Sequence, residues 1–129
     1  MRKVNRKLGF FILVVAMAAS VLAADRVSVV NLISSPEAYH DKEVIVGGFL
    51  SLDEEGSALY LHKDDYVHLL ANNGLWCSID VVTNKSFNHA YVYLEGKFDS
   101  NGRGHMGLFS GEIKNIKRVW MAPSQRGNK

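Results

Sequence analysis

The fold of this chain is decided by residues 43–53, which read EVIVGGFLSLD. From Val44 onward every second residue is apolar or glycine, and this period of two is that of a β-strand. The intervening positions begin with Ile45 and are also largely apolar, so we expect burial on both faces at the start of the strand. The pair Gly47-Gly48 in the strand interior predicts a bulge or sharp bend, which closure of a barrel requires.

Four more strands are predicted after a hairpin loop at residues 53–56, in which Gly56 is expected to supply a positive φ. The register of the last strand changes near Asn115, which predicts a bulge there. Five strands around one core indicate a mainly β protein with a small β-barrel, an architecture without free sheet edges. The predicted strands after the hairpin are 58–61, 75–82, 90–98 and 105–119.

Short helical pieces are expected before and between these strands. Ser28 is suited to cap a short N-terminal helix that runs through Ile33, and Ser35 to cap a second piece over 36–39. Residues 63–70 predict one or two helical turns, whereas residues 83–89 are polar and predict a loop.

The five-stranded oligonucleotide/oligosaccharide-binding (OB) fold has this number of strands. Its standard helix lies between the third and fourth strands, where this chain is expected to have the polar loop at 83–89. The predicted OB-like barrel therefore carries its helical turns between the second and third strands. The domain is expected to span residues 24–121, with a disordered tail at 122–129.

The first residues have the pattern of a secretory signal. Four basic residues lie within 2–7, and an apolar run over 8–22 ends in small residues. This pattern predicts a signal peptide over 1–23, cleaved after Ala23 or Ala24, and a periplasmic or secreted product. Cleavage is favoured over retention as a membrane anchor because the run is short for a span of about 20 apolar residues.

Removal of the signal reverses the sign of the net charge. The chain has 15 basic and 13 acidic residues, and four of the basic ones precede Ala24. Residues 24–129 therefore have 11 basic and 13 acidic residues, a net charge of −2. Nucleic-acid binding is not expected, since it needs clusters of phosphate-neutralising side chains. The single cysteine, Cys77, excludes an internal disulfide, and we interpret it as a small buried hydrophobe.

A glycine-rich motif at residues 104–111 reads GHMGLFSG. With the strand patterns, it resembles a family of small bacterial exported proteins of uncharacterised function that have a predicted OB-like barrel. The resemblance covers most of the domain and implies a fold and a motif. It implies no activity.

Two groups of residues together form the predicted ligand-binding surface. Aromatic side chains on a barrel face can stack sugars or bases, but ordinary core and cross-strand packing is the favoured explanation for them. Glycines in the 104–107 corner let a ligand approach the backbone closely. An arginine there can pair with an anion, and a histidine can donate a hydrogen bond or titrate near neutral pH. The alternative is a glycine-rich bend without a ligand. The aromatic group is Tyr60, Trp76, Tyr91 and Tyr93, and the corner supplies Arg103, Gly104, His105 and Gly107.

The densest group of metal-ligand types lies in residues 62–68. Asp64 and His68 have the i, i+4 spacing of one helical face, but with His62 they provide too few ligands for a usual zinc site. We favour the start of a helix stabilised by its acidic first turn. No metal, cofactor or catalytic residue is predicted.

The sequence thus favours an exported OB-like binding module with an unknown small ligand over an enzyme. Sugars or a protein surface suit its net charge better than nucleic acid. The alternative is an interaction or inhibitor protein that binds a partner through a strand edge or hairpin. A third hypothesis is a metal-dependent hydrolase that uses His62 and His68. The oligomeric state is not predicted.

Overall fold

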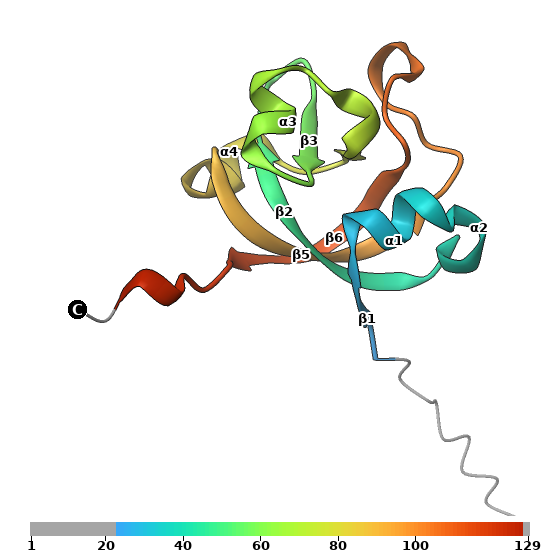
Figure 1. Ribbon diagram of the computed structural model, residues 1–129, viewed down its shortest axis with the longest axis horizontal. Coiled ribbons are helices and arrows are strands. Elements are labelled where there is room, and N and C mark those ends of the chain that lie inside the picture. The colour runs from blue at the N-terminus through green and yellow to red at the C-terminus, as the bar shows by residue number, and fades with distance from the viewer. Residues whose placement is uncertain (1–22, 128–129) are drawn as a thin grey trace, which may run out of the picture.

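A computed structural model describes residues 23–127 (Figure 1). The predicted signal peptide lies outside the described residues except for Ala23. The described chain is mainly β, and its strands are β1 (Asp25–Ser28), β2 (Glu43–Ser51), β3 (Ser57–Tyr60), β4 (Gly74–Cys77), β5 (Ala90–Asp99) and β6 (Glu112–Met121).

The five strands from β2 to β6 form a closed barrel. Their hydrogen-bonded order is β2-β3-β4-β6-β5, and an eight-residue antiparallel pairing of β2 with β5 closes the ring. The small OB-like five-stranded barrel predicted from the sequence is therefore confirmed. β1 was not predicted; it lies outside the ring and pairs in parallel with the first half of β2, from Asp25 opposite Val44 to Ser28 opposite Gly47.

The short N-terminal helices follow the prediction. The first, α1 (Val29–Ser34), begins where Ser28 Oγ accepts a hydrogen bond from the Asn31 backbone N–H at 3.1 Å. The second, α2 (Pro36–Tyr39), has the predicted bounds and the predicted N-cap residue, Ser35, but the Ser35 side chain makes no capping hydrogen bond. The third, α3 (Lys63–Val67), followed by the 3-10 turn η1 (Ala71–Asn73), supplies the expected helical turns between β3 and β4.

The predicted third strand, 75–82, ends at Cys77, and a helix replaces its second half. Asp80 caps α4 (Val81–Asn84) by accepting hydrogen bonds from the backbone N–H groups of Val82 and Thr83. The 3-10 turn η2 (Lys85–Phe87) follows, so the predicted polar loop at 83–89 is wrong. A one-turn helix therefore stands between the third and fourth barrel strands, where the OB fold has its helix.

The predicted last strand, 105–119, begins seven residues late. Gly104, Met106 and Gly107 have φ values of 62°, 57° and 67°, which an extended strand does not tolerate, and the 3-10 turn η3 (His105–Gly107) takes its place. The register change predicted near Asn115 is confirmed: Glu95 faces Arg118, whereas Lys97 faces Lys114. Beyond β6 the chain extends away from the barrel to η4 (Gln125–Gly127) (Figure 1), and the disorder of the tail stays a prediction.

Gly48 marks the place where β2 changes partner. β2 pairs with β1 up to Gly47 and with β3 from Phe49. The bend predicted at the glycine pair is consistent with this change of partner. Burial on both faces occurs in the second half of β2, from Gly48 to Ser51, and not in the first half as predicted, because Tyr66 of α3 packs on Phe49.

The core has two parts. The barrel interior holds a cluster of fully or nearly fully buried side chains that includes Val44, Val46, Leu94 and Phe98. A second cluster lies on the outer side of the β2–β4 wall beneath α3, and it consists of Phe49, Ala58, Tyr60 and Phe109 with Tyr66, Ala71 and Trp76 packed against them.

Candidate functional site

The predicted aromatic surface is divided between two places. Tyr60 on β3 and Trp76 on β4 belong to the outer cluster, where the ring of Phe109 lies 6.1 Å from Tyr60 and 5.4 Å from Trp76, both edge-on. Tyr60 is only 7% exposed. These aromatic rings therefore pack against one another rather than form an open platform.

Two glycine loops close over Trp76. A Cβ atom at Gly56 in the β2–β3 hairpin, or at Gly104 in the loop between β5 and β6, would overlap the indole ring. In many OB folds, ligands bind to the face of the second and third barrel strands, here β3 and β4, together with these two loops. Here that face is filled by the protein's own side chains.

The other residues of the predicted 104–107 corner do not pack against this aromatic cluster. Arg103, His105 and Gly107 are exposed, and a Cβ at Gly107 would meet no atom within 4 Å. The backbone of the corner bonds to itself, from Gly107 N–H to Gly104 C=O at 3.3 Å. The structure therefore brings Gly104 to Trp76 and leaves Arg103 and His105 on a solvent-facing turn.

Tyr93 lies elsewhere, on the outer face of β5. It faces Gly47 of β2 across the antiparallel pair, and a Cβ on Gly47 would approach its ring to 2.9 Å. Because Gly47 has no side chain, a groove of about 370 Å³ opens beside this ring. Its lining carries no Asp, Glu, Lys or Arg side chain and consists of Val27, Ser28, Gly47, Gly48, Leu61, His62, Tyr91, Tyr93 and Ala122.

Tyr91 forms a second aromatic wall of this Gly47 groove. It is 46% exposed, its ring packs edge-on against Phe49 at 5.4 Å, and its hydroxyl oxygen accepts a hydrogen bond from the Lys63 backbone N–H at 3.0 Å. That hydrogen bond ties the wall to the start of α3. The groove thus combines two phenol rings, a glycine floor and the exposed imidazole of His62.

A cation–π stack adjoins the groove. Tyr93 stacks on Trp120 of β6 with ring centroids 5.6 Å apart, and the guanidinium carbon of Arg26 on β1 lies 5.5 Å from the Tyr93 centroid. Arg118 covers Trp120 at 4.3 Å. Sequence reasoning missed Arg26 and Trp120. Alternation in β6 was available as a signal for Trp120, but Arg26 comes to Tyr93 only through β1.

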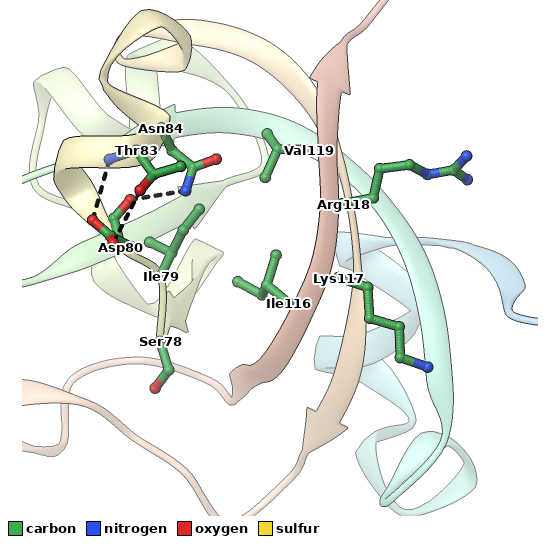
Figure 2. Close-up of a pocket in the computed structure, with 9 residues that line it drawn as sticks. All are labelled: Ser78, Ile79, Asp80, Thr83, Asn84, Ile116, Lys117, Arg118 and Val119. Atoms are coloured by element: carbon green, nitrogen blue, oxygen red, sulfur yellow. Dashed lines mark hydrogen bonds between the residues drawn. The ribbon is translucent and has the colours of Figure 1, made fainter.

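A second pocket, of about 280 Å³, lies between residues 78–84 and β6 (Figure 2). Ile79, Ile116 and Val119 point into it, whereas the side chains of Lys117 and Arg118 point away (Figure 2). The Asp80 carboxylate is fully engaged by α4, and these hydrogen bonds, chiefly from Thr83, lower its pKa. We interpret this pocket as the space left by a helix of one turn.

Comparison with known proteins gives no identity for this chain. No family model and no curated protein matches it. Among solved structures it is similar to a "putative aspartyl-tRNA synthetase" from Leishmania major Friedlin, with a TM-score of 0.46 and 12% sequence identity. The match covers 81% of this chain and 22% of that chain, so this chain spans about a fifth of that protein.

The predicted metal-ligand segment is a helix start. The buried Asp65 carboxylate accepts hydrogen bonds from the His62 backbone N–H and from Asn73 Nδ2, both at 2.9 Å. His62, Asp64 and His68 are exposed, and residues 23–127 contain no group of three or more His, Cys, Asp or Glu side chains placed to hold a metal. The acidic first turn therefore stabilises α3, as favoured from the sequence.

We expect Zn²⁺ to leave the melting temperature of the protein unchanged, because residues 23–127 hold no group of side chains that could bind it. A specifically bound ion would raise the melting temperature, since it stabilises the folded state by mass action. Differential scanning fluorimetry with and without Zn²⁺ tests this expectation, with EDTA-treated protein as the reference. A rise in melting temperature that disappears in His62→Ala and His68→Ala would contradict it and restore the hydrolase hypothesis.

Cys77 is buried in the barrel interior. Burial raises the pKa of its thiol to about 12, so the thiolate is not formed at neutral pH. Its surroundings agree with the role of a small hydrophobe. Within the described part of the chain, none of the helices has the length and apolar character needed to cross a bilayer.

Proposed function

We propose that this protein is an exported binding module that holds a saccharide ring in the Gly47 groove. The observation that carries the proposal is the groove itself, a cavity of about 370 Å³ between Tyr91, Tyr93 and the bare backbone of Gly47. Ligand pockets in proteins start at about 300 Å³ and are lined mainly by apolar and aromatic groups with a few polar ones.

The lining suits a sugar. Phenol rings offer an apolar face to the C–H groups of a pyranose and a hydroxyl at the edge. The Tyr93 and Tyr91 rings alternate along β5 with Val92, which is fully buried, so both belong to the outer face. The His62 imidazole adds a hydrogen-bonding group to the same lining.

Nucleic acid fits less well. Residues 24–129 have a net charge of −2, and the aromatic face that OB folds commonly present to bases is covered here by Phe109 and the loop that contains Gly104. Affinity for nucleic acid depends on several phosphate contacts, whereas the groove lining holds no Lys or Arg side chain.

Export is proposed from the basic and apolar pattern of residues 2–22. The barrel suits an oxidising compartment, since its one thiol is buried. N-terminal sequencing of protein recovered from the periplasm or medium tests this part of the proposal. A first residue of Ala24 or Asp25 is expected, and recovery of the intact N-terminus in the cytoplasm would contradict it.

We expect Tyr93→Ala to weaken saccharide binding by about tenfold, because the variant removes one aromatic wall of the groove. NMR titration of the ¹⁵N-labelled mature chain against a panel of disaccharides measures the effect. Arg103→Ala and His105→Ala are the controls, since both residues are exposed and neither lines the groove. Loss of binding in the controls with retention in Tyr93→Ala would place the site at the 104–107 corner instead.

A protein partner is the second candidate function, and one observation favours it. Leu69 and Met106 are 80% and 77% exposed, and both have left-handed φ values, 54° and 57°, which bulky residues rarely adopt. Their segments are tied together where Ser110 Oγ donates to the Asn72 carbonyl at 2.6 Å. A pull-down from periplasmic extract tests it: capture that is lost in Leu69→Ser and Met106→Ser would support this function.

A further inference from the structure

The groove has a cation at its edge. Arg26 lies on β1 next to Val27 and Ser28, which line the groove, and its guanidinium carbon is 5.5 Å from the centroid of the Tyr93 ring. One aromatic ring therefore serves both as a groove wall and as the support of the guanidinium group.

Arg26 differs from three basic residues of β6, Lys114, Lys117 and Arg118, in having no acidic partner among the described residues. Lys114 pairs with Asp99, Lys117 lies 3.5 Å from Glu43, and Arg118 lies 3.1 Å from Glu95. Within residues 23–127 no carboxylate lies within ion-pair distance of Arg26, and none lines the groove. The groove thus carries a local positive charge on a domain whose net charge is −2.

From this charge we infer, on the basis of the proposed function, that the saccharide held in the Gly47 groove is acidic and that Arg26 binds its carboxylate. A guanidinium group recognises a carboxylate through two parallel N–H···O hydrogen bonds, and its planar shape allows it to stay stacked on Tyr93 while it does so. A saccharide ring that lies in the groove beside Tyr93 has its substituents next to this guanidinium.

The groove has one arginine, Arg26, at its edge, and this arrangement suits a uronic acid better than a polyanion. A nucleic-acid strand places a phosphate at every nucleotide and needs a row of cations along its path. On this outer face the next arginine, Arg118, is already paired with Glu95 and stacked on Trp120. Of these two arginines, Arg26 is the one without a carboxylate partner, which matches a ligand with a carboxylate at the ring.

The experiment compares matched pairs of disaccharides that differ only in the oxidation of C6, namely glucuronate, galacturonate and mannuronate disaccharides and their neutral counterparts. Isothermal titration calorimetry on the mature chain measures both members of each pair. For the wild type we expect at least one acidic member to bind about tenfold more tightly than its neutral counterpart, an advantage that shrinks as salt is raised.

Arg26→Gln is expected to abolish this preference, so that the acidic and the neutral member of each pair bind with equal affinity. Arg118→Gln is the matched control, because it removes a stacked arginine that already has a carboxylate partner, and it should retain the preference. Unchanged melting temperatures of both variants would show that the barrel is intact.

The outcomes separate this inference from the proposed function. Equal affinity for acidic and neutral sugars, or a preference that survives in Arg26→Gln, overturns the inference and leaves saccharide binding standing. Failure of every sugar to bind overturns both. A single-stranded oligonucleotide that binds more tightly than all the sugars overturns both in favour of nucleic acid.

Discussion

Replacing Phe98 by alanine is expected to lower the free energy of unfolding by about 3–5 kcal/mol, the cost typical of removing a fully buried aromatic ring. Phe98 is 0% exposed and is among the largest fully buried side chains of the barrel. A total stability of about 5–15 kcal/mol is usual for a domain, so this single change removes a large part of it.

The surroundings of Phe98 explain why the site cannot collapse to fill the hole. Gly111 lacks a side chain where the ring passes, since a Cβ there would lie 2.5 Å from a ring carbon. The backbone of Phe98 is fixed on both sides, with its N–H donating to Lys42 C=O at 3.0 Å and its C=O accepting from Asp41 N–H at 2.9 Å. The backbone therefore stays in place and a cavity remains.

Urea denaturation monitored by tryptophan fluorescence measures this effect as a shift of the midpoint at constant slope. Phe98→Leu is the control, and its cost should stay below about 1.5 kcal/mol because much of the apolar volume is retained. A loss under about 1 kcal/mol in Phe98→Ala would mean that the barrel does not close around this ring.

The strands could be predicted from the sequence because their signal is local. Buried Val92, Leu94 and Phe98 alternate with more exposed residues along β5, and this period of two is visible without knowledge of any partner. The start of β6 could not be found in this way, because the apolar and glycine residues of 104–111 suggest a strand while positive φ values at Gly104 and Met106 break it.

The candidate site was only partly predictable. Alternation places Tyr91 and Tyr93 on the outer face of β5, and that much is local. Whether an outward ring is open or covered depends on contacts distant in sequence, and Phe109 closes the face at Trp76. Arg26 reaches Tyr93 because β1 pairs in parallel with β2. β1 has only four residues, and so short a strand leaves no recognisable pattern in the sequence.

The two neighbouring glycines of β2 are expected to respond differently to alanine. Gly48→Ala should cost about 1–3 kcal/mol, the range for overpacking, because the new Cβ overlaps the backbone carbonyl oxygen of Tyr60 and neither strand can move without breaking the β2–β3 pairing. Gly47→Ala meets only the edge of the Tyr93 ring, at 2.9 Å, and should cost about 1 kcal/mol or less.

Ligand binding should show the opposite order. A Cβ at Gly47 occupies the floor of the groove and displaces Tyr93, so saccharide binding falls although the fold is retained. Gly48 lines the groove only with its backbone, because a Cβ there points toward the Tyr60 carbonyl oxygen and Leu59, so Gly48→Ala keeps the groove as long as the barrel is folded. Thermal melts and NMR titration of both variants below their melting temperatures measure the two effects. If Gly47→Ala bound the sugar as well as the wild type, the groove could not be the site, because a Cβ at Gly47 projects into the groove against Tyr93.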